Sequence, residues 1–334
     1  MNAYIIGTGS YVPERVVSNE ELSARLGIAP ERIFKSSGIM RRHWADPGTT
    51  TSTLAFNALR LALKDSQVSP VEIDYLLVGT MTPDRFVPGC APAIQKAAGL
   101  QPIPCLDIRA ACCNALYALQ IACSLIRGRA ARTIAICLAE IQSAFLDLSP
   151  TSGTLSMLFG DGAAALIVSA NPRPAALEIL DVQLFTAGEY TDDLGIRRPG
   201  TQFGASRSNG ANQVTDFAPR MNGQTIILQA GRRMVAAGRS VLNDNNVSTE
   251  EVRWLVPHQA NANLLAQVAR ELTLSPPGCE VVSVIEETGN TSSASMGLAL
   301  DELRRSRRVR AGDYLLLPAF AAGFTWGAAL CRGS

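Results

Sequence analysis

Phe159-Gly160-Asp161-Gly162-Ala163-Ala164 and Phe324-Thr325-Trp326-Gly327-Ala328-Ala329 share the pattern F-x-x-G-A-A, and about half of the 334-residue chain separates them. Each stretch follows a turn-like segment and opens an apolar, strand-like run. Two more pairs of apolar segments repeat at a similar offset: Tyr75 to Val78 with Trp254 to Pro257, and Ile134 to Leu138 with Leu315 to Pro318. Because repetition at a fixed offset is the sequence signature of a duplicated unit, we expect two copies of one fold.

Between these segments, short β-like runs alternate with longer helical patterns, which predicts an α/β fold. We expect strands at Ala3 to Ile6, Tyr75 to Gly79, Thr133 to Leu138, Ala163 to Val168, Trp254 to Val256, Val281 to Val284 and Tyr314 to Leu317. We expect helices at Thr51 to Asp65, Cys113 to Arg127, Gly223 to Leu242, Ala262 to Leu272 and Ser295 to Arg305. The halves are expected to span 1–170 and 171–334, with the active site between them, where equivalent strand ends meet.

Composition excludes several classes of function. The 30 basic and 29 acidic residues leave no overall charge that would favour nucleic acid or an anionic membrane as a partner. No apolar run approaches the roughly 18 residues of a membrane-spanning helix. Cysteines such as Cys123 and Cys137 sit inside apolar runs, and Met1 to Pro13 lacks a secretory signature, so we expect a cytoplasmic protein with reduced thiols. Only two histidines and no C-x-x-C motif make a metal site unexpected.

Cys112 is the candidate nucleophile. In the stretch Asp107 to Leu119, an extended segment turns into a helix, and Cys112 stands at the turn. The N-terminus of a helix lowers the pKa of a cysteine, and the thiolate is the reactive form. The alternative is that Cys112 and Cys113 are small apolar core residues, as free cysteines usually are.

Two polar segments in the second half complete the candidate site. His258, in Val256 to Asn261, stands where a strand ends and a helix begins, whereas His43 lies among arginines and reads as a surface or strand-edge residue. The stretch Thr288 to Ser295 is small and polar and leads into an apolar helix. Taken alone, this stretch is equally typical of a turn followed by a helix cap.

Seven segments, in order, carry a resemblance that covers nearly the whole chain. They are Gly7 to Pro13, Ser37 to Ile39, the cysteine turn, Phe159 to Ala163, Pro257 to Asn261, Gly289 to Ser292 and Gly323 to Gly327. Together they resemble the thiolase-fold condensing enzymes, most closely the β-ketoacyl-acyl-carrier-protein synthase III group. The resemblance implies two fused, pseudo-duplicated βαβαβαββ halves in a layered αβαβα arrangement, which agrees with the repeat.

The same resemblance implies a role for each candidate. Cys112 is acylated by a thioester, while His258 and Asn290 bind the carbonyl of a malonyl-type thioester and stabilise the enolate that decarboxylation forms. The backbone N–H groups of Cys112 and Ala322 form the oxyanion hole. The partners are acyl and malonyl thioesters of acyl carrier protein or coenzyme A, a homodimer is implied, and neither a metal nor another cofactor is needed.

Departures from the family pattern fall among the substrate-binding positions. They are Arg32 and Ser152, where the family has the tryptophan and arginine that hold the adenine of coenzyme A, and Val87, where it has the phenylalanine that gates the acyl pocket from the neighbouring subunit. The resemblance also implies substrate-binding roles for Gly223 and Asn261. The basic docking position after His258 is Asn263. These changes point away from initiation with acetyl-coenzyme A and towards a specialised synthase with an unusual acyl chain, in fatty-acid-related or polyketide biosynthesis.

Two other functions stay open. The acyl group of Cys112 could pass to a hydroxyl or an amine, although the retained Asn290 favours condensation. A non-catalytic scaffold would need the loss of Cys112, His258 or Asn290, and all three residues are present.

The arginine-rich run, which spans 304–310, either is a solvated helix end or attracts an acidic carrier protein.

Overall fold

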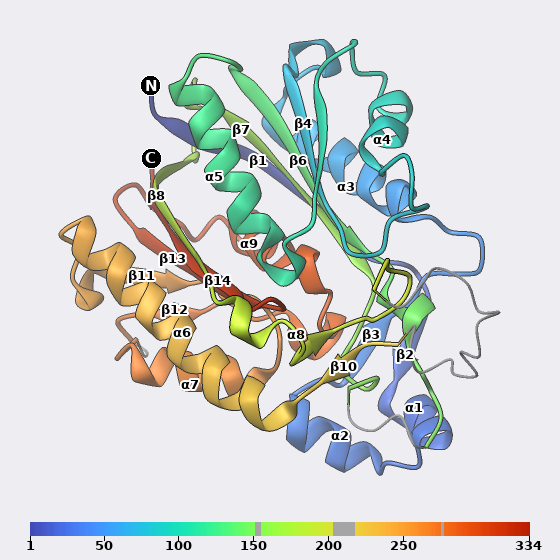
Figure 1. Ribbon diagram of the computed structural model, residues 1–334. Helices are drawn as coiled ribbons and strands as arrows, with labels where there is room; N and C mark the ends of the chain where they lie inside the picture. The colour runs from blue at the N-terminus through green and yellow to red at the C-terminus, as the bar shows by residue number, and fades with distance from the viewer. Residues whose placement is uncertain (151–154, 203–217, 275–276) are drawn as a thin grey trace.

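The computed structural model describes residues 1–150, 155–202, 218–274 and 277–334. Ten strands join in one sheet, in the order β12-β11-β13-β14-β8-β1-β7-β6-β4-β5 (Figure 1). The first five in the chain are β1 (Ala3–Tyr11), β4 (Tyr75–Gly79), β5 (Cys105–Ile108), β6 (Thr133–Glu140) and β7 (Gly162–Ser169). The other five are β8 (Leu177–Thr186), β11 (Val252–Leu255), β12 (Glu280–Val281), β13 (Tyr314–Ala321) and β14 (Thr325–Gly333).

The sheet consists of two halves with the same wiring. In each half the order is third, second, fourth, fifth and first strand of that half. The second strand pairs in parallel with the third and the fourth, and the fifth is antiparallel to the fourth and the first. The halves join where β1 pairs with the start of β8. We propose that the boundary lies in the connection from β7 to β8, as the expected division into 1–170 and 171–334 requires.

The sequence repeat falls on equivalent strands. The two F-x-x-G-A-A segments lead into and through β7 and β14, the fifth strand of each half. The glycine has a steric reason in the second copy, because a Cβ at Gly327 would collide with the carbonyl oxygen of Gln183 on β8. The other repeated pairs lie on or directly after β4 and β11, and on β6 and β13. The duplication inferred from sequence therefore describes the fold.

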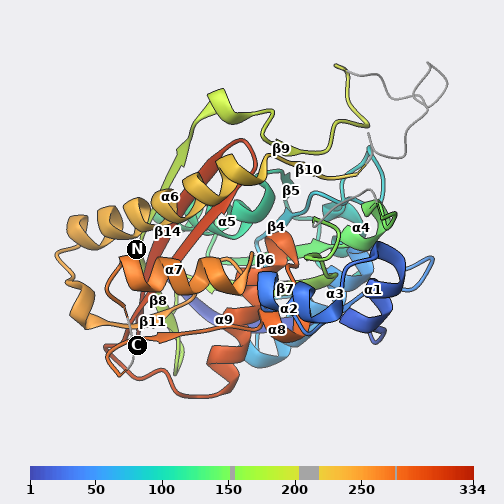
Figure 2. The ribbon, with the colours of Figure 1, turned by 90° about the horizontal axis from the view of Figure 1, so that it is seen from below.

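Helices form three layers around the two halves of the sheet. The long ones are α3 (Thr51–Ser66), α5 (Asn114–Arg127), α6 (Gly223–Asp244), α7 (Ala262–Glu271) and α9 (Ser295–Arg305). The short ones are α1 (Asn19–Leu26), α2 (Pro30–Ser37), α4 (Ala91–Ala97) and α8 (Ile285–Thr288). Helices α5 and α9 pack between the halves, α3 and α4 cover the outer face of the first, and α6 and α7 cover that of the second (Figures 1 and 2).

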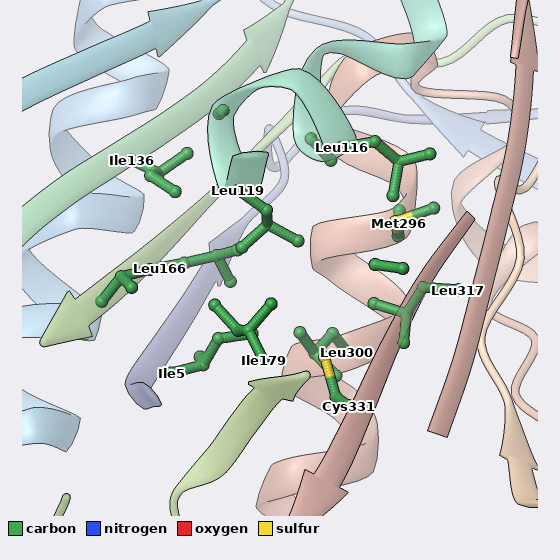
Figure 3. Close-up of a cluster of buried hydrophobic side chains, with 14 of the residues drawn as sticks. Ile5, Leu116, Leu119, Ile136, Leu166, Ile179, Met296, Leu300, Leu317 and Cys331 are labelled. Carbon is green, nitrogen blue, oxygen red and sulfur yellow. The ribbon is translucent and has the colours of Figure 1, made fainter. Parts of the chain in front are cut away.

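The central layer is the largest buried cluster. Leu116 and Leu119 of α5 meet Met296 and Leu300 of α9, and strands from both halves close the cluster around them (Figure 3). All four side chains are at most 2 % exposed. Because the buried faces of α5 and α9 touch both halves, the residues at the start of each helix are held at the junction between the halves.

Some expected boundaries need correction. Strand β8 was not predicted, because its burial pattern is irregular and it carries Glu178 and Asp181 among its apolar residues. The strand expected at Val281 to Val284 is shorter and earlier, at β12, because the chain turns into α8 after it. The short strands β2 (Val16–Ser18), β3 (Arg41–His43), β9 (Leu194–Gly195) and β10 (Arg220–Met221) form two small separate sheets.

Candidate active site

Cys112 lies between the edge strand β5 and helix α5, in the single 3-10 turn Ala111–Cys113. Ala111 has a φ of 49°, in the left-handed region that non-glycine residues seldom adopt. The side-chain oxygen of Asn114 accepts a hydrogen bond from the Ala110 N–H at 2.7 Å and closes the turn. A backbone outlier held by such a contact is typical of functional sites. The turn presents Cys112 to a cavity.

That cavity has a volume of about 260 Å³ and contains Cys112, Ser292 and Ala322 in its lining. Apolar side chains form much of its wall, among them Met81, Phe159 and Leu194. The neighbouring Cys113 does not line the cavity. Its side chain is fully buried, and its Sγ atom contacts the carbonyl oxygen of Thr325 at 3.4 Å. The two successive cysteines thus face different environments, as the rotation between helical neighbours predicts.

The Cys112 thiol is protonated in the resting chain. Burial raises its pKa to about 11, a hydrogen bond with the Ser292 hydroxyl opposes this rise, and the nearby Glu140 carboxylate adds to it. The Sγ and Oγ atoms of the Cys112–Ser292 pair are 3.5 Å apart. The lowered pKa that the sequence predicted for a cysteine at a helix N-terminus is therefore wrong for this state, because desolvation outweighs the stabilising contacts.

Asn290 is oriented by the same turn that contacts the thiol. Its side-chain oxygen accepts a hydrogen bond from the Ser292 N–H at 2.9 Å. Its backbone is held between the carbonyl oxygen of Leu158 and the N–H of Gly160, next to the first copy of the sequence repeat. Within the described ranges, its amide Nδ2 has no protein partner. The amide thus keeps a donor available while its oxygen is occupied.

His258 follows β11, and Ser295, the first residue of α9, fixes its ring. The His258 Nδ1 and Ser295 Oγ atoms are 2.6 Å apart, and Ser295 Oγ also accepts the Gln259 N–H at 3.2 Å. The serine hydroxyl must donate its own proton elsewhere, and among the described residues Nδ1 is the acceptor within reach. An unmatched donor at this buried position would be costly. Nδ1 is then the acceptor, and Nε2 carries the proton.

The His258 imidazole is also neutral. Burial lowers its pKa to about 4, since the charged form loses its hydration. A neutral ring with its proton on Nε2 is a hydrogen-bond donor on the side away from Ser295. Asn290 and Ser295 belong to one short segment, so this segment positions both the amide and the imidazole and also touches Cys112.

Ala322 stands in the turn that joins β13 to β14 and lines the cavity with Cys112. Among the described residues, no acceptor takes its N–H. The residue is thus placed where a backbone donor could meet an oxygen atom bound near the thiol.

Glu140 is a buried carboxylate that sequence reasoning missed. It ends β6 and accepts hydrogen bonds from the Met81 N–H at 3.1 Å and from the Thr82 hydroxyl at 2.9 Å. Burial raises its pKa to about 7, against the hydrogen bonds that lower it. Ser292 and Ser295 were also missed as individual residues. The signal was available, because a lone glutamate ends an apolar run and both serines lie in the polar stretch quoted above.

Comparisons with known proteins agree with this geometry. The family models described as 3-oxoacyl-[acyl-carrier-protein (ACP)] synthase III and its C-terminal part match residues 106–188 and 242–332. A β-ketoacyl-[acyl-carrier-protein] synthase III of Bordetella petrii is 38% identical, with 99% of this chain and 98% of that protein covered. One from Methylococcus capsulatus is 35% identical, with 98% of each chain covered. The chain belongs to the 3-oxoacyl-[acyl-carrier-protein] synthase III family.

Solved structures of members of this family have the same fold as this chain. The Aquifex aeolicus synthase III has a TM-score of 0.88 at 31% identity and covers 99% of each chain. The priming β-ketosynthase of the R1128 polyketide pathway has the same TM-score and identity, with 99% of this chain and 96% of that one covered. The synthase III is thus a condensing enzyme with the thiolase-like fold expected from sequence. No helix in the described ranges is both long and apolar enough to cross a membrane.

Of the predicted site residues, Cys112 and Ala322 line the cavity, whereas His258, Asn290 and the described substrate-binding residues are not part of its lining. Arg32 is exposed on α2, Gly223 begins α6, and Val87 is 75 % exposed beside Phe86, which does line the cavity. Asn261 caps α7 and donates a hydrogen bond to the Ser36 carbonyl oxygen at 2.8 Å, which ties α7 to α2. Ser152 lies outside the described residues. Their substrate-binding roles stay predictions.

The arginine-rich run lies at the far end of β13 from the cavity. The eight residues of β13 separate the end of the run from Ala322 by roughly 25 Å, at about 3.3 Å per residue. Arg304 donates to the Ala175 carbonyl oxygen at 2.6 Å, and Arg308 pairs with Glu280 at 2.5 Å. These contacts favour the helix-end interpretation over a docking surface for a carrier that must reach Cys112.

Proposed function

We propose that Cys112 takes an acyl group from a thioester and that a malonyl-type thioester then condenses with it. In the first step the thiol sulfur bonds to the acyl carbonyl carbon, the carbon–sulfur bond of the incoming thioester breaks, and its thiol leaves with the proton. In the second step the malonyl group loses carbon dioxide, and the resulting enolate carbon attacks the acyl carbonyl. The Cys112 thiolate leaves and is protonated, and a β-ketoacyl thioester is released.

The observation that carries the proposal is the pair of donors oriented by the segment 290–295. Asn290 offers its Nδ2, because its oxygen is bound to the Ser292 N–H, and His258 offers its Nε2–H, because Ser295 occupies Nδ1. Decarboxylation builds negative charge on the thioester oxygen, and two fixed donors stabilise that charge where it forms. A neutral imidazole with its proton on Nε2 can perform this task, because its N–H donates a hydrogen bond to the oxygen while the proton stays on the ring.

The first half-reaction makes the enzyme an acyltransferase, with Cys112 as the acceptor. We assign the backbone N–H groups of Cys112 and Ala322 to the oxygen of the tetrahedral intermediate; the shared cavity and the unoccupied Ala322 N–H support this role. The acyl and malonyl groups are carried by acyl carrier protein, which the names of the relatives contain, or by coenzyme A. A homodimer would bring Val87, exposed in the single chain, against the pocket of the neighbouring subunit.

The test separates loading from decarboxylation. Intact mass after incubation with acyl-coenzyme A and acyl-carrier thioesters reports loading, and carbon dioxide release from malonyl thioesters reports decarboxylation. His258→Ala and Asn290→Ala should slow decarboxylation by about tenfold to a hundredfold, the range for losing an oxyanion donor, and leave loading partly intact. Asn243→Ala, at an exposed position on α6, is the matched control.

Two outcomes would contradict the proposal. Equal losses of loading and decarboxylation in both variants would give these residues a structural role. Transfer of the acyl group to an alcohol or amine, without release of carbon dioxide, would replace condensation by plain acyl transfer.

A further inference from the structure

The cavity at Cys112 has an unusual charge balance for a site expected to hold an apolar acyl chain. Among the described residues, its lining contains three arginines, Arg85, Arg109 and Arg198, and no aspartate or glutamate. The rest of the wall is mostly apolar and includes Phe145 and Ile196. An apolar wall with a few convergent cationic groups selects a ligand that has both an apolar part and an anionic part.

Nearby carboxylates do not neutralise Arg85 and Arg109, although each arginine has an aspartate close in sequence. Asp84 accepts the Ser52 N–H at 2.9 Å. Asp107 accepts the N–H groups of Cys90 at 2.7 Å and Ala91 at 3.2 Å. Both carboxylates therefore accept hydrogen bonds from backbone N–H groups at the starts of α3 and α4.

The two guanidinium groups are correspondingly free. Within the described parts of the chain, neither Arg85 nor Arg109 forms a hydrogen bond, an ion pair or a ring contact. Arg198 lines the same cavity but has contacts of its own, so the argument rests on the other two. Guanidinium groups bind carboxylates through paired, charge-assisted hydrogen bonds that are about twice as strong as neutral ones.

We propose that the acyl group loaded onto Cys112 ends in a carboxylate, which Arg85 and Arg109 bind. The substrate class is the monothioester of a dicarboxylic acid, with its methylene groups against the apolar wall and its free carboxylate at the arginines. This inference rests on the proposed function, since it requires that Cys112 be acylated. A neutral chain of the same length would fill the cavity but leave both guanidinium groups without a partner.

The test compares matched pairs of substrates. Loading of Cys112 is followed by intact mass with succinyl- against butyryl-coenzyme A and with adipyl- against hexanoyl-coenzyme A. The wild-type protein should load the carboxylated member of at least one pair about tenfold faster, which corresponds to one charge-assisted contact. Arg85→Gln and Arg109→Gln should each remove most of that preference and change loading of the neutral chain less than about twofold.

Arg60→Gln, an exposed arginine on α3, is the matched control and should leave both rates unchanged. Faster loading of the neutral chains by the wild-type protein would overturn the inference and leave the proposed function standing. Equal losses on both members of a pair would also overturn it, because they would show that the arginines pair with a second copy of the chain or support the fold. Absence of loading by any thioester would instead refute the proposed function itself.

Discussion

Ser295→Ala tests whether the hydroxyl at the start of α9 sets the tautomer of His258. The substitution removes a buried donor 2.6 Å from Nδ1 and the acceptor of the Gln259 N–H. It adds no atoms, so the backbone of α9 has no steric reason to move. Without the serine proton on Nδ1, the imidazole can place its own proton there, and Nε2 then ceases to be a donor.

Two magnitudes follow from these contacts. A buried hydrogen bond contributes about 1 to 1.5 kcal/mol net, which corresponds to a loss of about fivefold to tenfold in decarboxylation rate. Leaving the buried Gln259 N–H without an acceptor costs about 1 to 3 kcal/mol in the free energy of unfolding. Loading of Cys112 should change less than decarboxylation, because Ser295 contacts His258, whereas the Cys112 thiol contacts Ser292.

The assay measures carbon dioxide release from a malonyl thioester, intact-mass loading of Cys112 and denaturant unfolding on one preparation. Ser66→Ala is the control, because this buried serine on α3 also loses a hydrogen bond to protein, 3.2 Å from the Leu63 carbonyl oxygen, but lies outside the site. A Ser295→Ala protein that is less stable yet decarboxylates at the wild-type rate would refute the tautomer argument.

Three further predictions concern other parts of the site and the fold. Cys112→Ala should abolish the acyl adduct while Cys113→Ala keeps it, because only Cys112 lines the cavity; intact mass decides, and an adduct on the first variant would refute the assignment. Because burial lowers the pKa of His258 to about 4, its neutral form persists on acidification, and the NMR signals of its ring should not titrate between about pH 8 and about pH 5.5; a titration near pH 6.5 would show an exposed imidazole. Arg304→Glu should lower the free energy of unfolding by about 1 to 3 kcal/mol, because Arg304 loses its contacts with the Ala175 carbonyl and the Asp65 carboxylate; denaturant unfolding measures this. Arg305→Glu should leave turnover of carrier-bound substrate within about twofold. A salt-sensitive loss of turnover in the Arg305 variant would restore the docking interpretation.

The helices and strands that could be predicted from sequence were those with a local periodicity of apolar residues. The helix at Ser295 to Arg305 was predicted with its observed bounds, because its apolar residues recur at helical spacing. Strand β8 was missed because its pairing with β14 and β1, rather than a local pattern, makes it a strand. Tertiary hydrogen bonds decide such segments, and their partners are far away in the chain.

The sequence by itself determined the duplication and the α/β class, because repeats and motifs are properties of residue order, and it supplied Cys112, His258 and Asn290 as the candidate site residues. Only the tertiary structure decided what surrounds those residues. The pKa of the Cys112 thiol is raised because burial, which depends on the packed halves, outweighs the contact with Ser292. The tautomer of His258 depends on a serine 37 residues away in the chain. Desolvation and hydrogen-bond geometry arise only when distant segments meet, and so they cannot be read from the order of residues.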